Sequence, residues 1–175
     1  IVANSIIEQI DALTKIANEF STFAKMPKPS EERLEINALI NGVKEVFALE
    51  GKSNISYESN KEKMFVMADR DQFVRVFNNL LKNAIQSIPH GRDAVIDIRA
   101  MVENNMIQIE ISDNGIGIEE SKRAKIFVPY FTTKSTGTGL GLAMVKQIIE
   151  NHRGQITFES AEDVGTTFHI VLPLA

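Results

Sequence analysis

The strongest hydrophobic pattern in the chain is a helical stripe at its start. Apolar residues recur at alternating intervals of three and four positions, namely at Ala3, Ile6, Ile10, Leu13, Ala17, Phe20 and Ala24. This spacing predicts the a/d seam of a coiled coil or helical bundle over residues 1–25. Further apolar residues widen the stripe, at Ile7, Ile16 and Phe23. We favour a bundle helix, and the alternative is a helix that packs back onto its own domain.

The stripe ends at a proline-rich segment. Met26 to Pro29 reads MPKP, and two prolines within three residues stop a helix and indicate a boundary. We therefore divide the chain into a helix over residues 1–27 and a second domain over residues 28–175.

The second domain alternates between helical and strand-like patterns. Helices are predicted over residues 38–49, 71–87 and 140–151, the first of them capped by Asn37. Strands are predicted over residues 34–36, 54–58, 63–67, 94–102, 106–112, 155–159 and 166–172. Asn104-Asn105 is typical of a hairpin turn, and residues 113–136 are predicted to form a loop. Helices that alternate with antiparallel strand pairs indicate an α+β fold, a two-layer α/β sandwich with helices on one face of the sheet.

Composition restricts the class of protein. The 175 residues are 43% hydrophobic and 24% charged, with a net charge of -4, as in a soluble domain rather than a nucleic-acid-binding surface. The chain has no cysteine, which excludes disulfides and thiolate metal sites. No apolar run is long enough to span a membrane, so we expect a cytoplasmic domain, with any membrane anchor outside this sequence.

The predicted helix over residues 71–87 carries two unusual asparagines. Asn79 and Asn83 are four apart, so they lie on one stripe outside the apolar face. Asparagine is a poor choice for an exposed helix, whereas an amide oxygen suits Mg²⁺. A polar helix edge or an internal hydrogen bond is the alternative explanation.

Two glycine-containing segments follow. Asp113 begins the run DNGIG directly after a strand, where its carboxylate could accept a hydrogen bond from an exocyclic amine such as that of adenine. A simple Asx turn would also explain this run. Residues 137–142 read GTGLGL and lead into a helix, whose unsatisfied N–H groups and dipole favour phosphate.

Taken together, these motifs resemble the ATP-binding domain of sensor histidine kinases. N-x-x-x-N, D-N-G-I-G, F-x-P-Y-F-T-T-K and G-T-G-L-G-L look like its N, G1, F and G2 boxes, in family order, and GTTF at residues 165–168 looks like its closing strand motif. The resemblance implies a Bergerat ATP-binding fold with a mixed, largely antiparallel sheet. Residues 1–29 look like the second helix of a dimerisation and histidine-phosphotransfer domain, and are most similar to nitrogen-regulatory NtrY-type kinases.

The resemblance also implies roles for individual residues, with ATP and Mg²⁺ as cofactors. Asn83 would be a magnesium ligand, with Asn79 near the phosphates, and Asp113 would hold the adenine amino group. The other implied contacts are Gly115 and Gly117 around the base, Phe127 and Phe131 as anchors of a flexible lid, Gly137, Thr138, Gly139, Leu140, Gly141 and Leu142 at the phosphates, and Thr167 at the base edge. Lys134 would be catalytic by reaching the γ-phosphate, and the alternative is a solvated loop lysine.

One expected feature of the family is missing. A phosphoacceptor histidine is followed by an acidic residue on the first bundle helix, and His90, His152 and His169 lack that context. We therefore expect a fragment of a longer, dimeric kinase, which transfers phosphate to a histidine outside this chain and thence to a response regulator. The alternatives are another ATPase of the same superfamily, which would need a carboxylate where Asn79 stands, and a nucleotide-gated interaction module.

Overall fold

The computed structural model describes residues 27–49, 54–134 and 137–175, together with Ile7, Ile10, Leu13, Thr14, Ala17, Phe20, Ser21, Phe23 and Lys25. Its labelled helices are α2 (Ile36–Leu49), α3 (Arg70–Ser87), α4 (Glu120–Arg123) and α5 (Gly141–Asn151). Its strands are β1 (Glu32–Glu35), β2 (Asn54–Ser59), β3 (Phe65–Ala68), β4 (Val95–Glu103), β5 (Met106–Asp113), β6 (Gln155–Ala161) and β7 (Gly165–Pro173).

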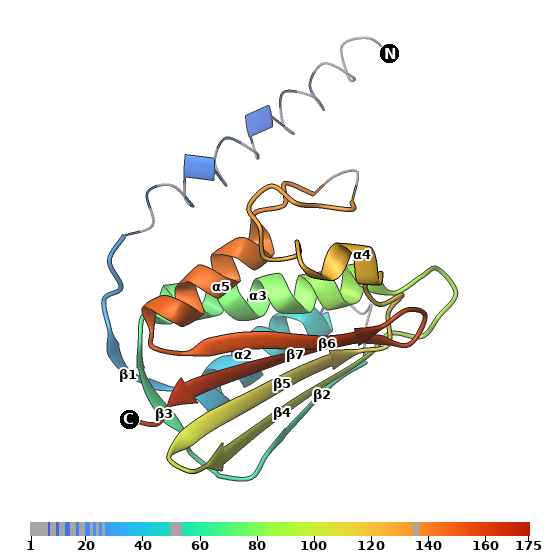
Figure 1. Cartoon of the computed structure of the whole chain (residues 1–175). Coiled ribbons are helices and arrows are strands. Elements are labelled where there is room, and N and C mark those ends of the chain that lie inside the picture. Colours follow the sequence, from blue (N-terminus) through green and yellow to red (C-terminus); the bar gives the residue numbers. More distant parts are fainter. Residues whose placement is uncertain are drawn as a thin grey trace.

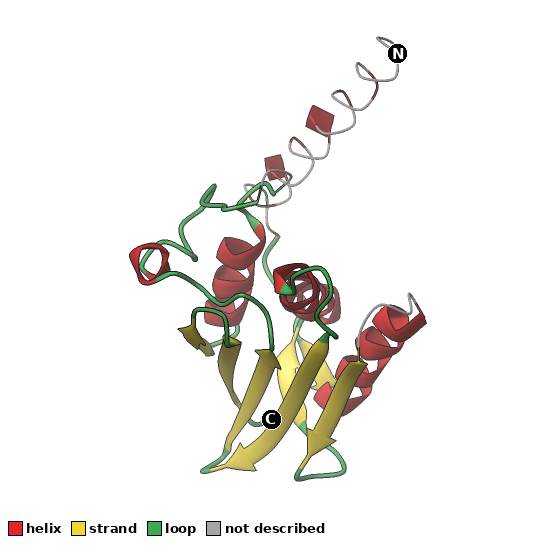
Figure 2. Ribbon diagram, turned by 90° about the vertical axis from the view of Figure 1, so that its right-hand side faces the viewer, coloured by secondary structure: helices red, strands yellow, loops and turns green. Residues whose placement is uncertain are grey.

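The strands form one large and one small sheet. The five-stranded sheet has the order β2-β4-β5-β7-β6, in which β2 and β4 are parallel and the other neighbours antiparallel. Strands β1 and β3 pair antiparallel in a separate two-stranded sheet. The α+β fold with a mixed, largely antiparallel sheet is thereby confirmed, and helices and large sheet form two layers (Figures 1 and 2).

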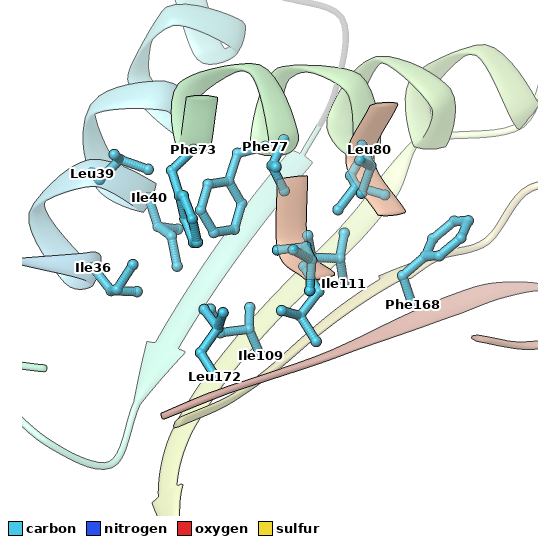
Figure 3. Packing of buried hydrophobic residues seen from close by; sticks show 14 of the residues in the cluster. Ile36, Leu39, Ile40, Phe73, Phe77, Leu80, Ile109, Ile111, Phe168 and Leu172 are labelled. Carbon is cyan, nitrogen blue, oxygen red and sulfur yellow. The ribbon is translucent and has the colours of Figure 1, made fainter. Parts of the chain in front are cut away.

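The core lies between the helices and one face of the large sheet. Phe73, Phe77 and Leu80 of α3 face Ile109 and Ile111 of β5, as Figure 3 shows. These side chains are at most 1% exposed, so α3 is fixed rigidly over the centre of the sheet. The backbone positions from which polar side chains project on the remaining stripes of α3 are therefore fixed.

The hairpin between β4 and β5 confirms the predicted turn. Glu103 pairs with Met106, so Asn104 and Asn105 form a two-residue loop, with φ values of 49° and 62°. Asparagine tolerates this left-handed conformation better than most residues, and two such residues match the right-handed twist of the strands.

The prediction that Asn37 caps helix α2 is wrong. Asn37 lies inside α2 and is buried, where its side chain donates to Lys61 O and Glu62 O and accepts from the Tyr57 hydroxyl. The carboxylate of Glu35 instead accepts from the N–H groups of Asn37 and Ala38 at 2.9 and 2.7 Å. A longer side chain two residues earlier, directly before the helix, therefore performs the capping.

Strand pairing also differs from the prediction in one place. The strands predicted over residues 54–58 and 63–67 do not form an antiparallel pair, because β2 pairs parallel with β4 and β3 pairs with β1. The loop predicted over residues 113–136 contains the single-turn helix α4. Neither difference was readable from hydrophobic alternation, which reports a strand's buried face and not its partner.

The apolar stripe near the start of the chain is partly described. Ile7, Ile10, Leu13 and Phe20 are helical and exposed, whereas Phe23 packs against the core of the domain. Ala3, Ile6, Ile16 and Ala24 of the predicted stripe lie outside the described residues. In the described part of the chain, no helix is both long and apolar enough to cross a membrane.

Candidate functional site

A cavity of about 690 Å³ collects most of the polar residues that the sequence motifs contain. It lies against α3, the loop after β5 and the segment that leads into α5, which loops above the helix layer in Figure 1. The predicted residues that line it are Asn79, Asn83, Asp113, Gly117, Phe131, Lys134, Gly137, Thr138, Gly139, Gly141 and Leu142. This volume is in the range of small-molecule sites, so the motifs meet in one ligand-sized space.

Helix α3 presents both asparagines to this cavity. The Asn79 amide donates to the carbonyl of Arg75 one turn earlier, at 2.9 Å. This bond orients the Asn79 Oδ1 atom toward α5, where a Cβ on Gly141 would lie 2.7 Å from it. The Asn79 side chain thus hydrogen-bonds to a backbone carbonyl of its own helix, and this bond holds its Oδ1 atom close to the start of α5.

Asp113 is held at the end of β5 by several donors. Its Oδ1 atom accepts hydrogen bonds from the Ser87 hydroxyl at 3.0 Å and from the Gly115 N–H at 2.8 Å. Burial raises the pKa of the Asp113 carboxyl above its usual value, and the N–H groups of Gly115 and Thr166 and the Ser87 hydroxyl offset this only in part. An ionised carboxylate at this position is therefore costly without a further donor.

The loop after Asp113 is fastened from two sides. The Ile116 N–H donates to the Ser87 carbonyl at 3.0 Å, and Arg92 donates to the carbonyls of Asn114 and Gly115. Gly117 has a φ of 69°, and a Cβ there would collide with the Ala161 carbonyl. The wall of the cavity at this loop is thus backbone, held in a conformation that glycine allows.

The glycine-rich turn closes against the segment before it. The Tyr130 N–H donates to the Gly139 carbonyl at 3.0 Å, and a Cβ on Gly139, whose φ is 71°, would collide with the Tyr130 backbone. Helix α5 begins two residues later, at Gly141. Its first N–H groups have no partner within an α-helix, so this end of the cavity favours an anion.

Lys134 reaches across the cavity to α3. Its Nζ atom donates to Asn83 Oδ1 at 3.2 Å and to Gln86 Oε1 at 2.9 Å. Burial lowers the pKa of the Lys134 ammonium, as does repulsion from Lys82, while Asp113 opposes both. Lys134 is therefore not a freely solvated loop lysine in this structure.

Four predicted residues do not line the cavity. Leu140 is a core residue, 1% exposed. Gly115 supports Asp113 from the loop, and Phe127 packs edge-on against Phe158 and Phe168 beneath the segment that leads into α5. Thr167 lies on the opposite face of β7, where its hydroxyl bonds to Ser112 at 2.9 Å.

Several cavity residues were not predicted, although their spacing gave a signal. Ser87 continues the four-residue spacing of Asn79 and Asn83 on α3, and Gln86 follows Asn83 by three positions. Thr166 faces the cavity in place of Thr167, because residues on one face of a strand alternate and Phe168 is buried on that same face.

A family model described as "Histidine kinase-, DNA gyrase B-, and HSP90-like ATPase" matches residues 68–175. The chain belongs to this family. The ATPase description agrees with a cavity that has a polar carboxylate at one end and a helix N-terminus at the other. The domain is of the histidine-kinase type: the nucleotide-free catalytic domain of histidine kinase ThkA is 32% identical, with a TM-score of 0.71, and the match covers 84% of this chain and 96% of that one.

Longer relatives match nearly the whole chain. Sensor histidine kinase ZraS of Escherichia coli (strain K12) is 34% identical over 99% of this chain and 37% of its own length. Sporulation kinase E of Bacillus subtilis (strain 168) is 32% identical over 98% of this chain and 23% of its own length. A structure of ThkA in complex with response regulator protein TrrA is 27% identical over 98% of this chain and 50% of that one, with a TM-score of 0.80. The chain thus spans a minor part of these curated relatives, and the finer likeness to NtrY-type kinases stays a prediction.

Proposed function

We propose that this chain is the catalytic ATP-binding part of a two-component sensor histidine kinase. In the complete protein it transfers the γ-phosphoryl group of Mg²⁺-ATP to a histidine outside this chain, and the phosphoryl group then passes to a response regulator. The observation that carries the proposal is that Asp113, Asn83, Lys134 and the start of α5 all meet in one cavity.

We propose an orientation for the nucleotide from the residues at the two ends of the cavity. The Oδ1 atom of Asp113 accepts hydrogen bonds from Ser87 and Gly115. In our proposal its Oδ2 atom accepts a hydrogen bond from the exocyclic amine of adenine. The phosphates then lie at the turn of Gly137, Gly139 and Gly141, before the N–H groups of α5. The missing side chains at the turn permit the close approach of the backbone to phosphate oxygens.

The donor set fits a magnesium ion that is held mainly by the nucleotide. Asn83 supplies an amide oxygen, a hard ligand of the kind that Mg²⁺ prefers together with water and substrate phosphates. When bound, the ion neutralises charge on the β- and γ-phosphates during phosphoryl transfer. The protein's own part is to hold the phosphates and to exclude water.

Lys134 supplies positive charge close to this position. Its ammonium already contacts Asn83, so a small movement brings it to a γ-phosphate held beside that residue. We propose that it stabilises the negative charge of the phosphoryl group as it is transferred.

We propose two partners by analogy with the relatives. ThkA was solved with the response regulator TrrA, and we propose a receiver domain as the partner of this chain as well. We also propose that the exposed stripe with Ile7, Ile10, Leu13 and Phe20 belongs to a homodimeric bundle in the complete protein. We place this part of the protein in the cytoplasm, where ATP is available.

A transfer assay tests the proposal. The chain is incubated with γ-labelled ATP, Mg²⁺ and an added acceptor bundle whose histidine precedes an acidic residue, with Asn83→Ala as the matched variant. Label on the bundle that disappears in the variant supports the kinase. Hydrolysis without transfer favours a nucleotide-gated interaction module or another ATPase of the family. The latter is less suited to the geometry, because Asn79 has no carboxylate to activate water.

A further inference from the structure

Two amide oxygens on α3 converge on one positive charge. Asn83 Oδ1 and Gln86 Oε1 lie 3.2 and 2.9 Å from Lys134 Nζ, so the ammonium sits in a pair of oxygens from adjacent turns of one helix. We call Asn83 and Gln86 the cation seat. Side-chain amide oxygens bind hard cations as well as ammonium groups, so the seat suits either kind of charge.

The seat is held in place by the protein core. Ala84 is 3% exposed and Leu80 is 1% exposed, so the neighbouring turns of α3 are fixed against the sheet. Lys134 is attached less firmly, in a turn in which the Thr132 hydroxyl accepts its N–H at 3.1 Å and the Gly137 N–H donates to its carbonyl at 3.2 Å. The lysine is therefore the partner that can leave.

Resting on the proposed function, we propose that Lys134 and the metal–nucleotide complex compete for this seat, with Gln86 as a positioning residue. Without nucleotide, the lysine ammonium occupies the seat and holds its own segment against α3. When nucleotide binds with Mg²⁺, Asn83 would give up its contact with the ammonium to serve as the metal ligand, and Lys134 would move toward the phosphates. The same lysine then serves as the counter-charge that the transferred group needs.

Charge around the seat supports such an exchange. Lys82 lies on the same helix and repels the Lys134 ammonium, whereas the Asp113 carboxylate attracts it. Two positive charges would not share one oxygen at short range, so the arrival of a divalent ion expels the lysine.

The test separates the seat from the γ-phosphate by using ADP, which lacks that group. In Lys134→Met the metal no longer competes with an ammonium, and we expect Mg²⁺-ADP to bind roughly three- to tenfold more tightly than in the wild type. Lys82→Met removes an equal charge from the same cavity without touching the seat, and should not tighten binding. Unchanged or weaker binding of Mg²⁺-ADP in Lys134→Met overturns the proposal.

A second measurement needs no nucleotide. Trypsin cleaves after Lys134, and the seat should protect that bond. We expect Gln86→Met to speed this cleavage and Gln86→Glu, which replaces an amide by a carboxylate, to slow it. Equal rates in wild type, Gln86→Met and Gln86→Glu overturn the seat. A wild type that binds no Mg²⁺-ADP contradicts the proposed function instead, and the order of cleavage rates then decides the seat alone.

Discussion

At the scale of single residues, Asp113 combines a structural cost with a binding role. Its carboxylate is partly buried, and this burial raises its pKa despite hydrogen bonds from Ser87 and Gly115. A protein that carried this group for stability alone would gain by neutralising it. We infer that the carboxylate is retained for the proposed contact with adenine despite its cost to stability. Such trade-offs between stability and activity are common at binding sites.

Asp113→Asn should separate these two properties. The amide oxygen still accepts from Ser87 and Gly115, but a nitrogen replaces the oxygen that meets the adenine amine. We expect ATP affinity to fall roughly tenfold to a hundredfold, by calorimetry.

The stability of the same variant should depend on pH. The folded-state pKa of Asp113 is raised above the ordinary value of 3.8. Below pH 3.8 the carboxyl group is protonated and does not destabilise the folded wild type. As the pH rises through the folded-state pKa, the carboxylate ionises and its burial lowers the stability of the folded wild type. In thermal melts without nucleotide, Asp113→Asn should therefore exceed the wild type at pH 8 by more than at pH 4. A gap that is independent of pH, or a destabilised variant, would contradict this account.

At the scale of elements, the helix ends show what the sequence could reveal. The α3 helix and its asparagine stripe were readable from spacing, since a 3.6-residue period separates the buried face from the cavity face. The cap of α2 could not be predicted, because Glu35 at the end of β1 reaches forward to the first N–H groups of the helix, and Asn37 is used for a buried network with Tyr57. Capping preferences describe local sequence, whereas these roles depend on which segments fold together.

Glu35→Ala tests the revised cap. It removes the acceptor of the Asn37, Ala38 and Met64 N–H groups, and should lower the free energy of unfolding by about 1–2 kcal/mol. The control is Glu45→Ala, on the exposed side of the same helix, which should change it by less than about 0.5 kcal/mol. Urea unfolding measures both, and equal effects would show that Glu35 does not cap α2.

The glycine turn permits a matched pair of substitutions with opposite signs. Gly139→Ala places a Cβ against the Tyr130 backbone at a positive φ, and should destabilise the protein by about 1–3 kcal/mol. Gly42→Ala, within α2, places a Cβ where, among the described residues and apart from the helix's own adjacent backbone, no heavy atom lies within 4 Å, and should stabilise the protein by about 0.5–1 kcal/mol. Two changes of the same sign in urea unfolding would show that the turn is not constrained as described.

At the scale of the whole molecule, the segment before β1 is tied to both helices of the site. The Ser30 N–H donates to Asp69 at the start of α3, and Arg153, just after α5, pairs with Glu31 at 2.8 Å. Helix α3 carries Asn83, and α5 begins at the glycine turn. The connection from the N-terminal helix therefore ends on the two elements that form the cavity.

The sequence predicted the location of this site better than it predicted the individual residues that line the cavity. Motif order brought Asn83, Asp113 and Lys134 to notice, and the structure places all three in one cavity. Choosing Thr167 over Thr166 failed because a one-residue difference on a strand exchanges its two faces. The spacing of Gln86 placed it on the cavity face, but its role could not be predicted because it depends on a lysine that is distant in the sequence.

Calorimetric titration with ATP, with and without Mg²⁺, tests the central claim most directly. We predict that the wild type binds ATP more tightly with Mg²⁺ and that Asn83→Ala loses most of this difference, because an amide oxygen that the ion needs is gone. Absence of binding by the wild type at millimolar ATP, or an undiminished Mg²⁺ effect in Asn83→Ala, would contradict the account of the cavity as a magnesium–nucleotide site.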